Sequence, residues 1–412
     1  MFQTVPLRAQ RDYRLLLSSR AVSEIGTEIS RLAIPLTAAA LLGASPVQMG
    51  LLTAAASLPS LMFGLQAGVL ADRLRRHRPV MVACEAASAM AMATIPLAWL
   101  AGLLTVPWLI VTAFVVGTGT TLFRAANFPH LAVVVDEGQR TEALAGLQSA
   151  HSLASICGPG IGGLLVQLFT APFAIVVDAL SFLASAFLVR SIRTPEDHTP
   201  APPRGLWAEI NEGLRTVMGN PVLRTLCGCG IVVNFFGATY MAVFVIYALT
   251  DLHLPAGLIG LLTAGFGVGG LAGTALIPRL TAKYGEHRLT ACAVLAFPLD
   301  YVLTATASGP TWAVFLALAV GGLVGGAAVV TFAVCFGAVV LRETPVHLRG
   351  RVNATNTFAV QGVLALGGLA GGLIGQLLGL RPVLWIGAAG VALTIPWIWS
   401  SPIGRSSGPR AR

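Results

Sequence analysis

Long apolar runs constrain this sequence more than any other feature. Stretches of about 18–27 residues with few charges recur twelve times, and a helix that crosses a bilayer needs about 20 residues. The runs cover residues 15–43, 47–71, 79–102, 105–130, 143–169, 172–190, 223–250, 256–280, 288–307, 311–341, 351–379 and 382–400. Only 10% of the 412 residues are charged, so the sequence predicts an all-α membrane protein with twelve transmembrane helices and excludes a soluble enzyme or a disordered chain.

The basic residues between these runs follow a one-sided pattern. If the N-terminus is cytoplasmic, 22 of the 26 Lys and Arg residues fall in inside segments, three lie within runs, and only Arg381 lies outside. Positive charge is retained on the cytoplasmic side of membrane proteins, so we expect cytoplasmic N- and C-termini. The net charge of +9 is divided among short clusters between apolar runs, which argues against nucleic-acid binding. We expect a multi-pass protein of the cell (inner, cytoplasmic) membrane, with the lipid bilayer as a partner.

One long polar connection divides the runs six and six. The predicted organisation is an N-terminal six-helix bundle over residues 1–190, a cytoplasmic linker over 191–222, a C-terminal six-helix bundle over 223–400 and a cytoplasmic tail over 401–412. Within the linker, Trp207, Ile210, Leu214 and Val217 share one face of a helix. This pattern predicts an amphipathic helix that lies at the membrane surface.

The two halves of the sequence repeat each other. The sequence Gly50-Leu51-Leu52-Thr53-Ala54 recurs at 260–264, an offset of 210, and Gly162-Gly163-Leu164 recurs at 371–373, an offset of 209. Because six runs separate the copies, both copies begin on the same side of the membrane. Parallel repeats of this kind are typical of secondary transporters, in which two bundles meet at a central seam that can hold substrate.

The sequence lacks the motifs of an ATP-driven pump or a metalloprotein. A Walker A loop needs a lysine followed by Ser or Thr, whereas the single lysine, Lys283, is followed by Tyr284. We find no clustered His or Cys with metal-ligand spacing, and we expect no cofactor, no metal and no catalytic residue. The sequence favours transport driven by an ion gradient, or facilitated diffusion.

Four charges in the first run call for an explanation, because a charge at mid-bilayer costs about 2.5–3.5 kcal/mol. Arg20, Glu24, Glu28 and Arg31 fall within a stripe of about 80° on a helix. One interpretation is a ladder of ion pairs that neutralises itself and faces another helix. The other is a proton site or polar cavity wall, in which Glu28 is the first candidate for proton coupling and Glu24 the second.

Other runs also contain ionisable residues. Glu85 and Arg124 lie at similar depth in adjacent runs, so we predict that they form an ion pair. Asp178 and Asp300 have no evident basic partner; Asp178 is a third candidate for proton coupling, and we interpret Asp300 as a protonated carboxyl that packs between helices. We interpret His151 as a hydrogen-bonded packing residue.

The loop after the second run carries a recognisable motif. The sequence from Gly68 through Asp72 and Arg73 to Arg76 resembles the signature loop of the major facilitator superfamily, although Arg75 stands where that pattern has Gly. The resemblance implies a conformational latch, in which Asp72 caps a helix that starts near residues 351–353 and closes the cytoplasmic side.

A second motif, Gly158-Pro159-Gly160-Ile161-Gly162-Gly163, is similar to one found in drug–proton antiporters of this superfamily. Its glycines permit close helix packing and its proline bends the helix. Further stretches, including residues 23–28 and 178–182, resemble enterobactin exporters and macrolide efflux proteins. The resemblance implies a proton-coupled antiporter that exports a hydrophobic or amphipathic small molecule by alternating access.

The same resemblance places the cavity along runs 1, 4, 7 and 10. Besides Glu28, the candidate cavity residues are Arg31, Arg124, Asn127, Asn234, Tyr240 and Thr331. We expect a monomer whose other partners are protons and a small-molecule substrate. The alternatives are an uptake symporter for a small polar solute and a membrane receptor that does not transport.

Overall fold

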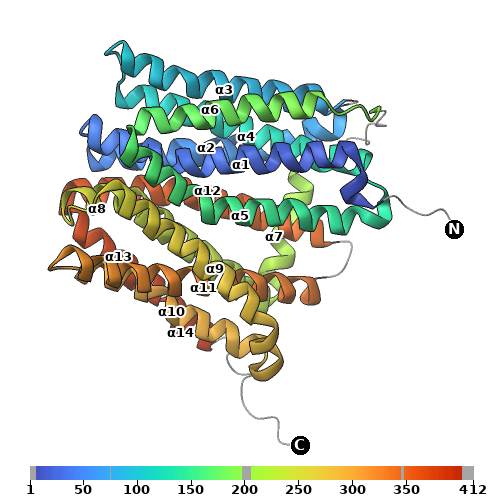
Figure 1. The fold of residues 1–412 in the computed structure, drawn as a ribbon. Coiled ribbons are helices and arrows are strands. Elements are labelled where there is room, and N and C mark those ends of the chain that lie inside the picture. Colours follow the sequence, from blue (N-terminus) through green and yellow to red (C-terminus); the bar gives the residue numbers. More distant parts are fainter. Residues whose placement is uncertain (1–5, 75, 197–205, 345–347, 401–412) are drawn as a thin grey trace, which may run out of the picture. The chain divides into compact units, whose positions relative to one another are not determined.

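The computed structural model describes residues 6–74, 76–196, 206–344 and 348–400 (Figure 1). Within this part of the chain the secondary structure is helical, with no strand. The α-helices are α1 (Arg11–Leu36), α2 (Pro46–Arg73), α3 (Arg78–Leu100), α4 (Val106–Val134), α5 (Arg140–Leu168), α6 (Ala171–Arg190), α7 (Leu206–Gly219), α8 (Pro221–Thr250), α9 (Ala256–Tyr284), α10 (Glu286–Thr306), α11 (Thr311–Glu343), α12 (Arg349–Leu378), α13 (Leu380–Ala392) and α14 (Thr394–Ser400).

Each predicted apolar run coincides with a helix to within a few residues, with two exceptions. The first run continues past α1 through a π-helical segment, Thr37–Leu41, and the last run is divided into α13 and α14. Eleven helical segments in the described residues are long and apolar enough to cross a membrane. The 26-residue helix α1 is long enough but is not among them, because it contains the charges of the first run. The multi-span architecture is thus confirmed, while the count of twelve spans and the side on which the termini lie stay predictions.

The chain divides into two compact units. Unit 1 takes Met1–Gly43, Ala55–Pro203 and Pro255–Leu261; unit 2 takes Ala44–Ala54, Arg204–Leu254 and Leu262–Arg412. The start of α2, to Ala54, therefore belongs to unit 2, and the start of α9, to Leu261, belongs to unit 1. These two segments carry the repeated Gly-Leu-Leu-Thr-Ala sequence. The first copy lies wholly in unit 2, whereas the second copy begins in unit 1 and continues beyond Leu261 into unit 2.

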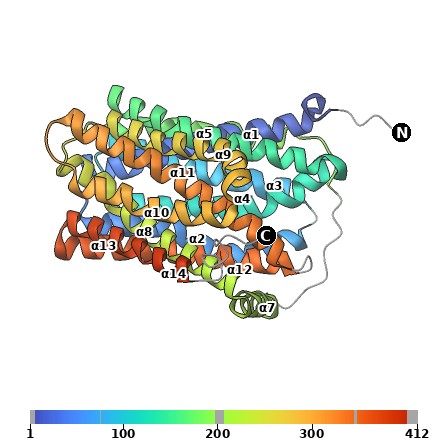
Figure 2. The same cartoon turned by 90° about the horizontal axis from the view of Figure 1, so that it is seen from below.

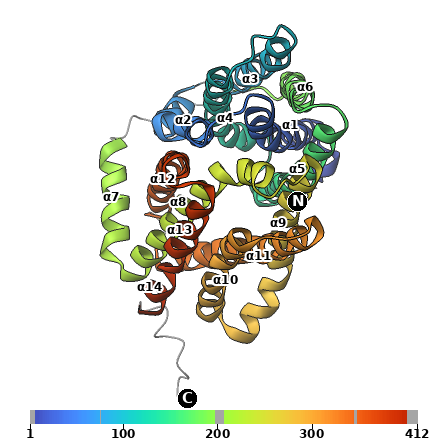
Figure 3. The same cartoon turned by 90° about the vertical axis from the view of Figure 1, so that its left-hand side faces the viewer.

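The same six helix pairings recur in both units. In unit 1, α1 packs against α4, α5 and α6, α3 packs against α4 and α6, and α5 packs against α6 (Figure 3). In unit 2, the equivalent helix α8 packs against α11, α12 and α13, α10 packs against α11 and α13, and α12 packs against α13 (Figure 2). The repeat in the sequence is therefore a repeat of structure.

Glycines bring the repeated helices close together. A Cβ atom on Gly162 of α5 would lie 3.1 Å from the Cα of Ile29 on α1, and one on Gly371 of α12 would lie 2.9 Å from the Cα of Thr239 on α8. Ile29 and Thr239 are themselves 210 positions apart. These contacts leave no room for larger side chains, which explains why the glycines occur in both copies.

The repeated sequences also pack against each other in pairs. Within unit 1, a Cβ atom on Gly163 would lie 2.8 Å from the Cα of Gly260; within unit 2, one on Gly372 would lie 2.8 Å from the Cα of Gly50. The Gly-Leu-Leu-Thr-Ala sequence of each copy thus contacts the Gly-Gly-Leu sequence of the other copy. Mutual packing of this kind explains why both sequences are repeated.

The residues after α6 are bound to the rest of unit 1 by two carboxylates. Asp12 accepts hydrogen bonds from the backbone N–H groups of Arg193 (3.0 Å) and Thr194 (2.8 Å) and from the Thr194 hydroxyl (2.6 Å). Glu196 accepts from the N–H groups of His77 (2.6 Å) and Arg78 (3.0 Å), which begin α3. We call these contacts the α6 clamp. They anchor the start of the predicted linker.

In the α6 clamp, burial raises the pKa of Asp12 and of Glu196, but hydrogen bonds outweigh burial. The Thr194 hydroxyl and the Thr194 and Arg193 amides bring the pKa of Asp12 below its usual range. The pKa of Glu196 is lowered by His130, whose Nδ1 lies 2.5 Å from Glu196 Oε1, and by the Arg78 amide. Both groups are therefore held as carboxylates near neutral pH.

Candidate functional site

The two carboxylates of the charged stripe of α1 lie in the interior of unit 1. Glu24 and Glu28 are only 6% and 3% exposed. Glu24 is paired with Arg20 one turn earlier, and Glu28 Oε1 lies 3.0 Å from a guanidinium nitrogen of Arg31. The ion pairs of the predicted ladder therefore form, at the spacings of i,i+4 and i,i+3 that the sequence indicates.

A second helix completes this stripe. His151 of α5 places Nδ1 3.1 Å from Oε2 of Glu24, so the Glu24 carboxylate contacts two basic groups. The His151 and Arg31 side chains are 36% and 63% exposed, although the carboxylates beside them are buried. Two of the basic partners, and not the carboxylates themselves, thus present open surface; Arg20, the third, is 16% exposed. His151 is hydrogen-bonded, as expected from the sequence, but its partner Glu24 was not predicted.

The Gly-Pro motif of α5 packs directly against Glu28. A Cβ atom on Gly158 would collide with the Cβ of Glu28, so glycine is what lets α5 approach α1 here. Gly158, Pro159, Gly162 and Gly163 are all buried. The sequence predicts close packing by this motif. The structure adds that the residue against which it packs is Glu28, the first candidate for proton coupling.

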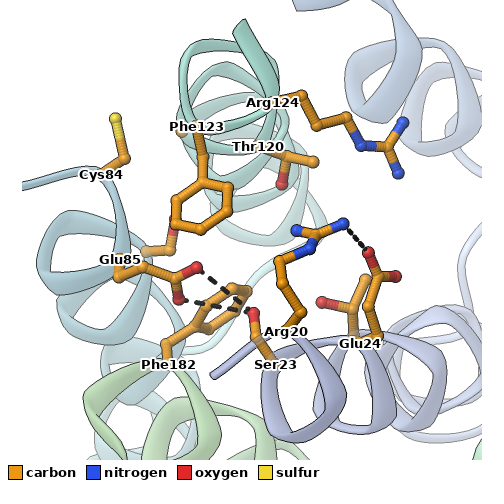
Figure 4. A pocket seen from close by; sticks show the side chains of 12 residues that line it. Arg20, Ser23, Glu24, Cys84, Glu85, Thr120, Phe123, Arg124 and Phe182 are labelled. Carbon is orange, nitrogen blue, oxygen red and sulfur yellow. Dashed lines mark hydrogen bonds and ion pairs between the residues drawn. The ribbon is translucent and has the colours of Figure 1, made fainter. Parts of the chain in front are cut away.

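A small cavity lies beside the stripe, between α1, α3, α4 and α6 (Figure 4). Its volume is about 20 Å³, enough for a water molecule and far below the several hundred Å³ of a drug-sized site. The lining residues are Arg20, Ser23, Glu24, Thr27, Cys84, Glu85, Ser88, Gly119, Thr120, Phe123, Arg124 and Phe182. In this structure the cavity has room for a water molecule and not for an organic substrate.

The predicted ion pair between Glu85 and Arg124 does not form. Both residues line the cavity, but Glu85 lies beside Ser23, whose hydroxyl is 3.4 Å from each carboxylate oxygen (Figure 4). Arg20 lies over the ring of Phe123, with 5.3 Å between its guanidinium carbon and the ring centre. Equal depth in adjacent helices was the basis of the prediction, and depth does not fix the direction in which a side chain leaves its helix.

Asp178 on α6 is completely buried against α1. It accepts a hydrogen bond of 3.1 Å from the Ser181 hydroxyl, and a Cβ atom on Gly26 of α1 would lie 2.5 Å from Asp178 Oδ1. No cation in the described residues lies within ion-pair distance of it. Asp178 therefore has the buried, unpaired position that the sequence indicates.

The other predicted cavity residues differ in their surroundings. Asn127 of α4 has a buried Oδ1 without a hydrogen-bond partner in the described part of the chain, and the amide of Asn234 donates to the Gly230 carbonyl at 2.8 Å. Tyr240 is 6% exposed; its hydroxyl lies 3.1 Å from that of Thr304, and its ring stacks on Phe244. Tyr240 thus belongs to the core of unit 2, and Thr331 is also buried.

The predicted latch lies at the end of α2. Gly68 is within that helix with no atom near its absent Cβ, and Arg76 in the following loop is exposed. The side chains of Asp72 and Arg73 lie outside the described residues, so their contacts stay predictions.

Comparison with known proteins identifies the family. The family model described as transmembrane secretion effector matches residues 3–404. The chain belongs to the major facilitator superfamily, in its transmembrane secretion effector family. Members of this superfamily are transporters and not enzymes, and this chain is a multi-pass membrane transporter of the secondary type.

Relatives of this major facilitator protein include efflux pumps. The multidrug efflux pump Tap of Mycolicibacterium fortuitum is 29% identical over 86% of this chain and 85% of its own length. The MFS-type transporter YfiS of Bacillus subtilis is 27% identical over 90% and 88%. Among solved structures, the nucleoside transporter NupG superposes with a TM-score of 0.76 at 13% identity, covering 96% of this chain and 99% of NupG. At 13% identity, the similarity to NupG shows the fold alone.

The second unit of this transporter repeats the packing of the site without its charges. By the offset of 210 found in the sequence, Glu24 corresponds to Asn234 and Glu28 to Ala238. A Cβ atom on Gly367 of α12 would lie 3.1 Å from the Cβ of Ala238, which reproduces the contact of Gly158 with Glu28. Aligning the two halves residue by residue would have exposed this difference in the sequence.

Proposed function

We propose that this transporter exports hydrophobic or amphipathic small molecules, such as drugs, siderophores or secondary metabolites, in exchange for protons by alternating access. The efflux of drugs by the Tap proteins and by PmrA of Streptococcus pneumoniae, as their names state, supports export. The buried carboxyls in unit 1 support coupling to protons, because ionisable groups inside a membrane are costly and mark proton or substrate pathways.

The observation that carries this proposal is the difference between the two units. Helices α8 and α12 pack as α1 and α5 do, with Ala238 in place of Glu28 and Asn234 in place of Glu24. The fold therefore does not require carboxylates at these positions. Their presence in one copy argues for transport chemistry and against a ladder whose only role is to join two helices.

Glu28 is the first candidate for the coupling step. When Glu28 binds a proton, the O–H bond forms on the carboxylate and the ion pair with Arg31 is lost. Arg31, which is already 63% exposed, is then free to change its partner. Glu24 pairs with Arg20 and His151 in a similar arrangement, and Asp178 is a third carboxyl that can hold a proton.

The remaining roles follow from the resemblance to other major facilitator proteins. Arg31, Arg124 and Asn127 are proposed to face substrate from unit 1, and Asn234 from unit 2. The loop that contains Gly68, Asp72, Arg73 and Arg76 is proposed to latch the cytoplasmic side, and the termini are proposed to be cytoplasmic.

Transport in inverted membrane vesicles tests this proposal. Vesicles with an acidified interior are given ethidium, a cationic dye, or Nile red, a neutral one. An exporter loads dye, and a protonophore abolishes the loading. Glu28→Gln keeps the shape of the side chain and is expected to remove proton-driven loading while the protein remains folded.

The alternatives give different results in the same assay. An uptake symporter for a small polar solute would load neither dye and would move solute out of the vesicles together with protons. A receptor that does not transport would show no gradient-driven flux and no effect of Asp72→Asn. Dye loading that is equal in wild type and Glu28→Gln would refute the assignment of Glu28.

A further inference from the structure

We propose that Glu85 of α3 carries a proton in the transport cycle and exchanges it with Glu24 of α1 through a water molecule held in the cavity of unit 1. This inference rests on the proposed proton coupling and adds to it a residue on another helix. Glu85 was predicted to pair with Arg124, and that pair does not form.

The surroundings of Glu85 suit a proton carrier. The residue is 4% exposed, and no cation in the described residues lies within ion-pair distance of its carboxyl. Its hydrogen-bonding neighbours are the Ser23 hydroxyl, 3.4 Å from each oxygen, and the Ser185 hydroxyl. The charges of Arg20 and Asp178 also act on it. A buried carboxylate without a paired cation is costly, whereas a neutral carboxyl can donate one hydrogen bond and accept others. Glu85 is thus a position where a proton can reside.

Glu24 has the opposite surroundings at the same cavity. Its oxygens contact the Arg20 guanidinium and His151 Nδ1, so the charged form is matched by basic groups. A pair of carboxyls whose surroundings differ in this way can act as proton donor and proton acceptor. In Figure 4 the Glu85 and Glu24 side chains lie on either side of Arg20 and Ser23.

The cavity supplies the connection between the two carboxyls. Its volume of about 20 Å³ exceeds the 10–15 Å³ that a water molecule needs, and its lining offers several polar partners, including Ser23, Thr27 and Thr120. In the transfer, the O–H bond of Glu85 breaks as the water accepts that proton. The water releases a different proton to Glu24, so the water is restored and one proton has moved between helices.

Packing does not account for the presence of Glu85. By the offset of 209 found for Gly162-Gly163-Leu164, Glu85 of α3 corresponds to Val294 of α10 in the second copy. Val294 is 0% exposed, and α10 makes the same pairings with α11 and α13 that α3 makes with α4 and α6. The fold therefore accepts a buried apolar residue at this position.

The charged groups around this pathway come from five helices. They are Arg20, Glu24, Glu28 and Arg31 on α1, Glu85 on α3, Arg124 on α4, His151 on α5 and Asp178 on α6. Removing one carboxyl changes the field at the others, so a test must observe the Glu85 proton itself.

Infrared spectroscopy of the purified full-length protein at neutral pH observes that proton directly. The difference spectrum of wild type minus Glu85→Gln is expected to contain the C=O stretching band of a protonated carboxyl. Glu85→Val introduces the residue found at the equivalent position 294, and it is expected to give the same difference if Gln impairs folding. A difference spectrum that contains carboxylate bands alone would overturn the proposal. This result does not depend on which dye the protein transports, so it is distinct from a failure of the proposed function.

The connection to Glu24 has its own measurement. Glu24→Gln is expected to shift the Glu85 band, because the two groups share a water molecule, whereas Glu142→Gln on the exposed start of α5 leaves the band in place. In vesicles, Glu85→Gln is expected to lower acid-driven ethidium loading by about tenfold or more while preserving exchange of ethidium across the membrane. A band unaffected by Glu24→Gln, or loading equal to wild type, would contradict the relay.

Discussion

At the scale of single residues, the buried charges of unit 1 are the basis of the proposed proton coupling. Each carboxyl has different surroundings: Glu28 is paired with an exposed arginine, Glu24 with Arg20 and His151, and Asp178 with a serine hydroxyl. Such differences separate groups that release protons from groups that accept them. Titratable side chains of these kinds, placed on neighbouring helices, are what a proton-coupled transporter requires.

His151 provides a test at this scale, because it is the exposed partner of a buried carboxylate. The imidazole is one of two basic groups that contact the Glu24 carboxylate. We expect His151→Gln to lower the initial rate of acid-driven dye transport in vesicles while the protein remains folded. A rate equal to that of wild type would show that the contact is only structural.

Gly158 provides a second test at this scale. Gly158→Ala places a methyl group against the Cβ of Glu28, and we expect a loss of about 1–3 kcal/mol in the free energy of unfolding. Thermal unfolding in detergent measures it. Gly64→Ala on α2 is the matched control, because no atom lies within 4 Å of its added methyl group. Equal melting temperatures for the two variants would contradict the close packing of α5 on α1.

At the scale of elements, the α6 clamp joins three helix ends. Asp12 at the start of α1 binds the residues after α6, and Glu196 binds the N–H groups at the start of α3. Carboxylates at a helix N-terminus satisfy backbone donors that have no partner within the helix. These contacts hold the end of α6 where the predicted linker begins.

The α6 clamp is expected to weaken in acid. Because the pKa values of Asp12 and Glu196 are lowered in the folded protein, their contribution to stability is present above the unfolded values and is lost as the pH falls through the folded ones. Hydrogen exchange of the amides of residues 77, 78, 193 and 194 should therefore accelerate as the pH falls below the usual carboxyl range, relative to amides elsewhere in unit 1.

Substitution tests the same contacts at neutral pH. Asp12→Asn and Glu196→Gln should each cost about 1 kcal/mol or more and expose the corresponding amides to exchange, while Glu142→Gln should not. Protection that survives both substitutions would mean that the carboxylates do not hold this segment.

At the scale of the whole molecule, duplication explains most of what the sequence could predict. Hydropathy located the helices to within a few residues, and the repeated glycines identified helices that pack closely. Directions around each helix were not predictable from depth, which is why the Glu85–Arg124 pair was wrong. The α6 clamp was also missed, because its donors are backbone N–H groups of a connecting segment, and these leave no pattern in the sequence.

The repeat makes a prediction of its own. A Cβ atom on Gly50 would lie 2.5 Å from the Gly368 carbonyl oxygen, and one on Gly260 would lie 2.6 Å from the Pro159 carbonyl oxygen. We expect Gly50→Ala and Gly260→Ala to lower the melting temperature by similar amounts, each losing about 1–3 kcal/mol. Gly64→Ala and Gly265→Ala are controls with open space around the added methyl group. A large effect at only one of the two positions would contradict the equivalence of the copies.

Proton movement that accompanies export tests the central claim most directly. Protein in liposomes loaded with the pH indicator pyranine is given ethidium on one side, and the internal pH is followed as the dye crosses the membrane. Our account predicts that wild-type protein moves protons opposite to the dye, and that Glu28→Gln exchanges dye without moving protons. Proton movement of equal size in wild type and Glu28→Gln would contradict it.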